Sequence, residues 1–224
     1  MQKLNQPEII LALDVDTLKE AKEFVDKLYP KIKIFKVGSR LFTAYGPKII
    51  ELLHKKGAEV FLDLKYFDIP NTVAGAVEAA VRLRVKMLTL HISGGQEMLK
   101  RAVDAANHQA KMLKITRPLL IGITVLTSQA TKAVEVLALA KQGLKAGLDG
   151  VVCSAQEAGI LRGKIKNNFV IVTPGIRPDN LGKDDQKRTA TVSQAIKAGS
   201  NFLVIGRPIL RAADPLAATK RLLE

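Results

Sequence analysis

The stretch AEVFLDLKYFDIPNT, residues 58 to 72, joins an apolar run to a cluster of charged side chains. The run from Val60 to Leu62 is typical of a buried β-strand, yet Asp63 and Lys65 follow it at once, and Asp68 comes shortly after them. Removing such charges from water costs free energy unless they are paired, so strand interiors rarely carry them. We therefore expect the charged groups at the end of this strand to be paired with opposite charges and to form part of a functional site.

Short apolar runs like this one alternate with longer segments in which apolar residues recur every three or four positions. The runs predict β-strands and the segments predict α-helices. The predicted strands are EIILALD (8–14), KIKIFKVG (31–38), AEVFLDLK (58–65), VKMLTLHI (85–92), PLLIGITVL (118–126), DGVVCS (149–154), FVIVTPG (169–175) and NFLVIG (201–206). The predicted helices include one opened by a capping box, Thr17 to Glu20, and one that Gly57 closes, 47–56, together with 72–84, 95–110, 133–146, 192–199 and 215–224.

Repeated βα units predict a parallel sheet, and eight of them in 224 residues favour a closed (β/α)8 TIM barrel over an open doubly wound sheet. No linker rich in Gly or Ser divides the chain, so we interpret residues 1–224 as a single α/β domain. In such barrels the active site lies at the C-terminal ends of the strands. Polar residues at those ends are therefore the candidates for chemistry.

Charged residues occupy several of these strand ends. The first strand ends in Asp14, the second contains Lys36, and the third ends with Asp63 and Lys65. Because side chains alternate along a strand, we expect Asp63 and Lys65 to project together into the barrel mouth. Opposite charges that alternate in this way lower the cost of crowding them out of water. A rim of ion pairs with a purely structural role is the alternative interpretation.

A second polar region follows the last two strands. The connection TPGIRPDNLGKDDQKRTAT, residues 173–191, is long and rich in Gly, Pro and charge, which is typical of a lid over a ligand. In IGRPIL, residues 205–210, Gly206 and Arg207 precede the last helix, where backbone N–H groups and an arginine suit a phosphate. Together with Arg177, they predict an enzyme that acts on a phosphorylated small molecule.

The composition narrows the possible partners and the compartment. The net charge is +14, from 35 Lys and Arg against 21 Asp and Glu, which favours anionic partners. The basic residues are dispersed without interleaved aromatics, so we expect a solvated surface and no nucleic-acid binding. No apolar run is long enough to cross a bilayer, so we expect no membrane partner. Cys153 is the only cysteine and we find no export signal, which predicts a cytoplasmic protein.

The motifs, taken in order, resemble those of the orotidine 5′-phosphate decarboxylase family, which makes UMP in the last step of de novo pyrimidine synthesis. The matching pieces are LALD (11–14), FKVG (35–38), FLDLKYFDIPNT (61–72), HISGG (91–95), VLTS (125–128), TPGIR (173–177) and IGRPI (205–209). Phe67 departs from the pattern, because many bacterial members have a histidine there. The resemblance implies orotidine 5′-phosphate as substrate, UMP as product, and no metal or organic cofactor.

The resemblance also implies a role for each matching residue. It implies that Lys65 is the proton donor and that Asp63 lies against the substrate carboxylate. Lys36 and Asp14 would contact the ribose hydroxyls, with Lys36 also completing the charged chain. The remaining substrate contacts implied are Thr127 for the pyrimidine and Arg177, Gln186, Gly206 and Arg207 for the phosphate.

By the same resemblance, Asp68 and Thr72 reach into the active site of a second subunit, which implies a homodimer with shared sites. Two other interpretations stay open. One is a Mg²⁺-dependent sugar-phosphate decarboxylase or synthase of the same superfamily, against which IPNT (69–72) and LTS (126–128) argue. The other is a catalytically silent, basic barrel that binds nucleic acid.

Overall fold

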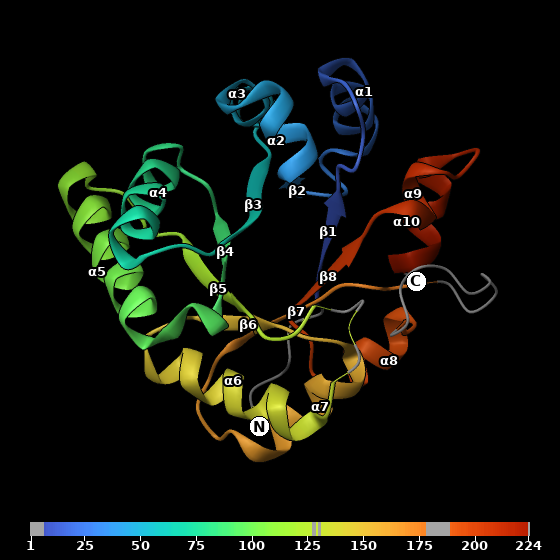
Figure 1. The fold of residues 1–224 in the computed structure, drawn as a ribbon. Helices are drawn as coiled ribbons and strands as arrows, with labels where there is room; N and C mark the ends of the chain where they lie inside the picture. Colours follow the sequence, from blue (N-terminus) through green and yellow to red (C-terminus); the bar gives the residue numbers. More distant parts are fainter. Residues whose placement is uncertain (1–6, 127–128, 130, 178–188, 224) are drawn as a thin grey trace.

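The computed structural model of the chain describes residues 7–126, 129, 131–177 and 189–223. Within these residues, eight strands pair in parallel and in sequence order as a closed barrel, with helices around it (Figure 1). The strands are β1 (Glu8–Ala12), β2 (Ile34–Gly38), β3 (Glu59–Tyr66), β4 (Met87–His91), β5 (Leu119–Ile123), β6 (Gly150–Val152), β7 (Val170–Thr173) and β8 (Phe202–Ile205). The helices are α1 (Leu18–Leu28), α2 (Ser39–Tyr45), α3 (Pro47–Lys55), α4 (Pro70–Arg82), α5 (Gly95–Leu113), α6 (Ala133–Lys145), α7 (Ala155–Lys164), α8 (Val192–Lys197), α9 (Arg207–Leu210) and α10 (Pro215–Leu223), with a 3₁₀ turn, η1 (Ile92–Gly94), before α5.

Closure depends on pairing between the first strand and the last. Leu11 of β1 pairs with Phe35 of β2 on one side and with Ile205 of β8 on the other. Every strand therefore has two neighbours, and the sheet has no exposed edge. The predicted (β/α)8 barrel is confirmed.

Helix starts are specified locally, and one of them was predicted. At the start of α1, Glu20 N donates to Thr17 Oγ1 at 3.1 Å, and Thr17 N donates to Glu20 Oε2 at 3.0 Å. The same kind of capping box, formed by Ser154 and Glu157, opens α7, a helix that we did not predict. The buried face of α7 includes small alanines and a charged residue, so its apolar periodicity is weak. The short helices α2 and α9 were not predicted either.

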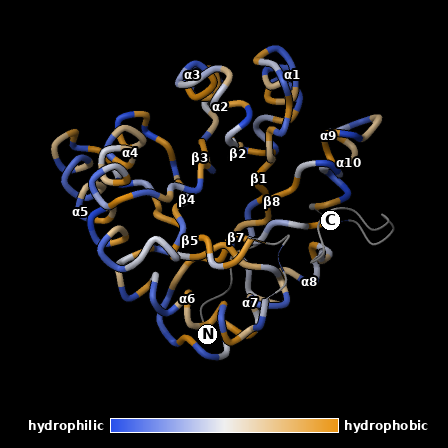
Figure 2. The backbone as a smooth tube through the Cα atoms, viewed as in Figure 1, coloured by the Kyte–Doolittle hydropathy of each residue, from blue (hydrophilic) through white to orange (hydrophobic). Residues whose placement is uncertain are grey.

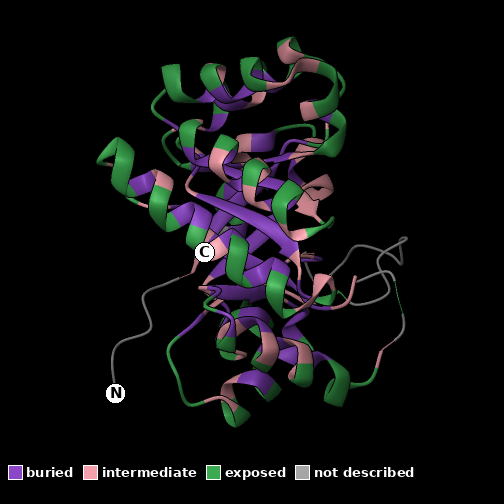
Figure 3. Cartoon of the chain, turned by 60° about the vertical axis from the view of Figure 1, so that its left-hand side comes forward, coloured by how far each residue is buried: buried purple, intermediate pink, exposed green. Residues whose placement is uncertain are grey.

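Strand side chains fill two separate apolar layers. One layer lies between the strands and the helices, and it includes Leu11 and Phe35. The other fills the barrel interior and consists of Ile10, Ala12, Ile34, Phe61, Met87, Ile121, Val172, Phe202 and Val204. The strands are hydrophobic (Figure 2), and they are buried while the outward helix faces are exposed (Figure 3).

Alternation along the strands places charge directly above the inner layer. Two residues after Ala12 comes Asp14, two after Ile34 comes Lys36, and two after Phe61 comes Asp63. Side chains two residues apart share one face of a strand, so Lys36 and Asp63 stand at the C-terminal mouth of the barrel. Asp14 lines the same mouth from the connection after β1, which ends at Ala12 and not at Asp14 as predicted.

The ladder between β3 and β4 is irregular at this mouth. Leu62 pairs with Leu88 and Tyr66 pairs with Leu90, so residues 63–65 of β3 face the single residue Thr89. Lys65 has a φ of +52°, in the left-handed region that a residue with a side chain rarely adopts. Regular alternation, on which the sequence prediction relied, therefore does not describe β3 beyond Asp63.

The described helices also bear on the expectation about membranes. Within the described ranges of the chain, no helix combines the length and apolar character needed to cross a bilayer.

Close packing of β6 against β7 generates a stability prediction. A Cβ on Gly150 would lie far inside van der Waals contact of the Val170 carbonyl oxygen, which belongs to a strand and has little freedom to move. We expect Gly150→Ala to lower the free energy of unfolding by about 2–3 kcal/mol, or to prevent folding, as overpacked sites do.

The matched control is Gly159→Ala on the exposed side of α7, where an added Cβ meets nothing within 4 Å. This change should raise the free energy of unfolding by about 0.5–1 kcal/mol, because alanine favours helix more than glycine does. Urea unfolding measures both variants. Equal stabilities for the two variants would contradict the prediction.

Candidate active site

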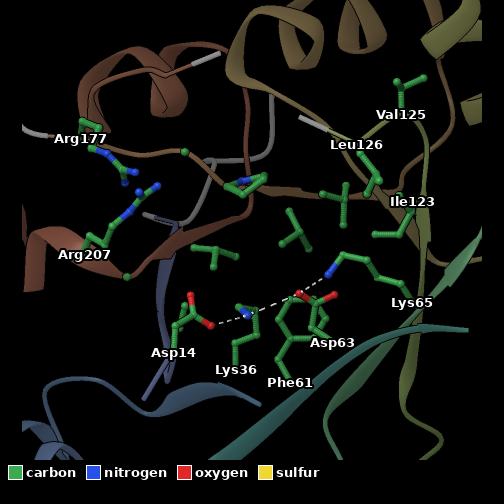
Figure 4. A pocket seen from close by; sticks show the side chains of 17 residues that line it. Asp14, Lys36, Phe61, Asp63, Lys65, Ile123, Val125, Leu126, Arg177 and Arg207 are labelled. Atoms are coloured by element: carbon green, nitrogen blue, oxygen red, sulfur yellow. Dashed lines mark hydrogen bonds and ion pairs between the residues drawn. The ribbon is translucent and has the colours of Figure 1, made fainter. Parts of the chain in front are cut away.

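A cavity of about 240 Å³ opens at the C-terminal end of the barrel. Polar and charged side chains line two of its sides, and apolar side chains line the rest (Figure 4). The lining residues are Ala12, Asp14, Lys36, Phe61, Asp63, Lys65, Ile123, Val125, Leu126, Val152, Val172, Pro174, Gly175, Arg177, Val204, Gly206 and Arg207. They come from almost every strand of the barrel, as expected for a site at this face.

Four charged side chains form a row along one side of the cavity (Figure 4). Lys36 Nζ lies 3.3 Å from Asp14 Oδ1 and 3.5 Å from Asp63 Oδ2. Lys65 Nζ lies 2.9 Å from the same Asp63 oxygen. The charges therefore alternate as the sequence predicted, and Asp63 lies between the two ammonium groups.

The two lysines differ in their access to the cavity. The side chain of Lys36 is 12% exposed, whereas that of Lys65 at the end of the row is 37% exposed. Lys65 is therefore the ammonium that remains open to a ligand, while Lys36 is held between two carboxylates.

The carboxyl group of Asp63 is buried and yet charged. Burial by itself raises its pKa, because charge is poorly solvated inside the protein. The ammonium groups of Lys36 and Lys65 and the hydrogen bonds from Lys65 and Thr89 act in the opposite direction and prevail, so the pKa of Asp63 is lowered. Asp63 is consequently a fixed negative charge at neutral pH.

Thr89 is a site residue that the sequence did not reveal. Its hydroxyl donates to Asp63 Oδ1 at 2.9 Å and accepts a hydrogen bond from the backbone N–H of Lys65, also at 2.9 Å. Within the run MLTLH (87–91), a threonine is an ordinary β-former, and nothing in the local pattern marks it as a partner of the charged row.

Two arginines lie on another side of the cavity. Arg177 follows β7 and Arg207 begins α9, and Figure 4 shows their guanidinium groups close together at the mouth. The loop that carries Arg177 is anchored by its backbone N–H, which donates to Ala190 O at 2.9 Å. Two guanidinium groups beside Gly206 form a suitable site for a phosphate or another multivalent anion.

Apolar side chains complete the lining of the cavity. Ile123, Leu126, Val152 and Val172 line this part of the cavity. Such a lining accepts a flat, weakly polar ring and excludes water from its faces. The cavity as a whole suits a molecule with an anionic end, a polar middle and a planar ring.

Asp68 and Thr72 do not join the cavity of their own chain. Both are exposed, in the connection after β3 and in the first turn of α4. Asp68 Oδ1 accepts a hydrogen bond from Ile69 N at 2.6 Å. Phe67 and Ile69 on either side are 61% and 67% exposed, so an apolar, solvent-facing surface surrounds the carboxylate.

His91 lies beside this exposed segment. Its ring packs against Phe67 with 5.6 Å between the centroids. Burial and the nearby Lys65 ammonium lower the pKa of His91, although Asp63 opposes them. Two other predicted contacts, Thr127 and Gln186, lie outside the described residues, as does the middle of the predicted lid, 178–188.

The chain is similar along most of its length to a family model and to named proteins. Residues 7–222 match the family model described as Orotidine 5′-phosphate decarboxylase / HUMPS family. The orotidine 5′-phosphate decarboxylase of Vibrio cholerae serotype O1 is 47% identical over 223 residues, covering 95% of each chain. That of Saccharophagus degradans is 46% identical over 228 residues, covering 96% of this chain and 93% of the relative.

A solved structure agrees with this placement. The crystal structure of orotidine 5′-phosphate decarboxylase from Lactobacillus acidophilus superposes with a TM-score of 0.85, at 36% identity and with 98% of each chain covered.

The charge on Asp63 makes a prediction about pH. A carboxyl whose pKa is lower in the folded state stabilises the fold above its ordinary value of 3.8, and this stabilisation is lost as the pH falls through the lowered pKa. We expect the difference in the free energy of unfolding between the wild type and Asp63→Asn to be constant near neutral pH. Below about pH 4 this difference should shrink as the pH falls through the lowered pKa of Asp63. Urea unfolding across this range measures it, and a difference that grows on acidification would be inconsistent with the assigned charge.

Proposed function

The chain belongs to the orotidine 5′-phosphate decarboxylase / HUMPS family, and we propose that it converts orotidine 5′-phosphate to UMP, with Lys65 as the proton donor. This reaction is the last step of de novo pyrimidine synthesis. The observation that carries the proposal is the Asp14–Lys36–Asp63–Lys65 row, which faces two arginines across one cavity. Relatives that are 46–47% identical and bear this enzyme's name support it.

Each part of the substrate has a suitable partner in the cavity. The phosphate suits Arg177, Arg207 and the backbone at Gly206. The ribose hydroxyls suit Asp14 and Lys36, which accept and donate hydrogen bonds respectively. The pyrimidine ring then lies along the apolar wall, with its carboxylate directed at the Asp63–Lys65 end of the row.

The reaction needs a positive charge at the carbon that loses CO₂. When the bond between C6 and the carboxylate breaks, its electron pair stays on C6, where the ring delocalises it poorly. The Lys65 ammonium, more exposed to the cavity than Lys36, stabilises this charge and then transfers its proton to C6. Asp63, whose Oδ2 lies 2.9 Å from Lys65 Nζ, holds this ammonium group at the cavity.

The phosphate contributes to the reaction although it binds away from the reacting carbon. Binding energy from Arg177 and Arg207 is available to orient the ring against Lys65. Substrates without the phosphate would then lose turnover as well as affinity.

We also propose a cytoplasmic homodimer that shares its active sites. Phe67 and Ile69 expose apolar surface beside Asp68, and a second copy would cover this surface. Asp68 and Thr72, which stand outside the cavity of their own chain, would then complete the cavity of the partner.

A Mg²⁺-dependent sugar-phosphate enzyme of the same superfamily is the second candidate. The described part of the chain has no group of three or more His, Cys, Asp or Glu side chains that could hold a metal ion. Asp14 and Asp63, the carboxylates that line the cavity, are both paired with lysine. These pairings favour the decarboxylase, because an ammonium already occupies the place where a cation would bind.

Metal-free protein should decarboxylate orotidine 5′-phosphate, and Lys65→Ala should lower kcat by about 10⁴-fold or more, because it removes both the charge and the proton. Loss of the orotate absorbance measures turnover, and calorimetry with UMP measures binding, which Lys65→Ala should retain.

Absence of turnover by the wild type would remove the proposed function. Near-normal kcat in Lys65→Ala would remove the role of Lys65. Salt-dependent binding of DNA or RNA that UMP does not compete away would favour the nucleic-acid alternative.

Mixing inactive Lys65→Ala and Asp68→Ala chains under conditions of subunit exchange should restore up to about a quarter of wild-type activity. Half of the random dimers are mixed, and each mixed dimer has one intact site if Asp68 acts across the interface. Mixing Asp68→Ala with the doubly substituted chain is the control, since it builds no intact site. No recovery in the first mixture, with exchange demonstrated, would place Asp68 outside the partner's site.

A further inference from the structure

The irregular ladder between β3 and β4 leaves backbone groups without their usual strand partners. Residues 63–65 of β3 face Thr89 alone, and the left-handed conformation of Lys65 interrupts the strand. A backbone N–H that is lost from the ladder must find another acceptor, because an unpaired buried donor is costly. The Thr89 hydroxyl supplies that acceptor for Lys65.

The same hydroxyl connects Lys65 with Asp63. Its oxygen accepts from Lys65 N, and its proton is donated to Asp63 Oδ1, both at 2.9 Å. The other oxygen of that carboxylate, Oδ2, lies 2.9 Å from Lys65 Nζ. Hydrogen bonds therefore run in a closed ring from the Lys65 backbone through Thr89 and Asp63 to the Lys65 ammonium.

Because the ring is buried, water cannot easily replace its hydrogen bonds. Thr89 is 0% exposed and Asp63 is 8% exposed. With water excluded, a missing hydroxyl would leave one carboxylate oxygen and one N–H without these partners. The unusual backbone at Lys65 is the kind of strained conformation that persists only when its surroundings hold it.

We propose that Thr89 is a positioning residue that fixes the backbone of Lys65 and the carboxylate of Asp63 relative to each other, so that the ammonium is aimed into the cavity. The inference rests on the proposed function, in which Lys65 stabilises and protonates the reacting carbon. Thr89 itself does not line the cavity and acts through its two partners.

Two substitutions separate the hydroxyl from the shape of the side chain. Thr89→Val keeps the shape and removes the hydroxyl, whereas Thr89→Ser keeps the hydroxyl. We expect Thr89→Val to lower kcat by about ten- to a hundredfold, as small displacements of a reacting group do, with the affinity for UMP within about threefold of wild type. Thr89→Ser should retain kcat within about threefold of wild type.

A control variant separates this effect from a general loss of a buried hydroxyl. Thr219 of α10 is equally buried, and its hydroxyl donates to Pro215 O at 2.8 Å, away from the cavity. Thr219→Val should keep normal kcat even where urea unfolding shows that it is as destabilised as Thr89→Val.

A readout that needs no turnover is the titration of the Asp63 carboxyl by ¹³C NMR. The groups that face it are Lys36 on β2, Lys65 on β3, and Thr89 and His91 on β4. Loss of the Thr89 hydrogen bond should move the Asp63 pKa upward in Thr89→Val, whereas Thr89→Ser should match the wild type.

The possible results are distinct. If the wild type fails to act on orotidine 5′-phosphate, the proposed function fails, and the NMR titration still decides whether Thr89 holds Asp63. If the wild type is active, three results overturn the proposal: normal kcat in Thr89→Val, an equal loss in Thr89→Ser, or a parallel loss of UMP binding. An unchanged Asp63 titration in Thr89→Val overturns it in either case.

Discussion

The pairing of one buried carboxylate with two ammonium groups is the interaction on which the site depends. Asp63 pairs with Lys36 from β2 and Lys65 from β3 and accepts a hydrogen bond from Thr89 of β4. Burial strengthens these attractions and would penalise Asp63 heavily if they were lost. Three strands must therefore hold their register for the row to form. The closed barrel, with its packed interior layer, provides that rigidity.

The charged groups of the cavity come from two parts of the chain that are far apart in sequence. Residues from β1 to β3 supply the alternating charges, whereas the segments after β7 and β8 supply the arginines. The arginines lie towards the Asp14 end of the charged row, whereas Lys65 lies at its other end (Figure 4). Under the proposed function, phosphate binding and the chemistry at Lys65 would therefore depend on different parts of the fold.

The architecture and the charged row could be predicted because each leaves a local pattern. Lys36 follows the barrel-facing alternation of β2, Asp14 comes directly after β1, and the capping box at Thr17 fixes the first helix. The interruption at Lys65 could not be predicted, because strand register depends on neighbours that are distant in sequence. For the same reason, Thr89 looked like any β-former. The helix after Ser154 was missed because its buried face includes small and charged residues. Asp68 and Thr72 lie outside the cavity of their own chain, and their role in a second subunit stays a prediction.

The pairing of β1 with β8 has a consequence for how the protein is made. The first strand leaves the ribosome early, but its second neighbour and Arg207 lie near the end of the chain. Until β8 has been synthesised, the hydrogen-bonding edge of β1 is open and the phosphate end of the cavity is incomplete. A nascent chain that already contains Lys65 therefore still lacks Arg207, on another side of the cavity. Under the proposed function, the complete cavity therefore forms only after β8 and Arg207 have been synthesised.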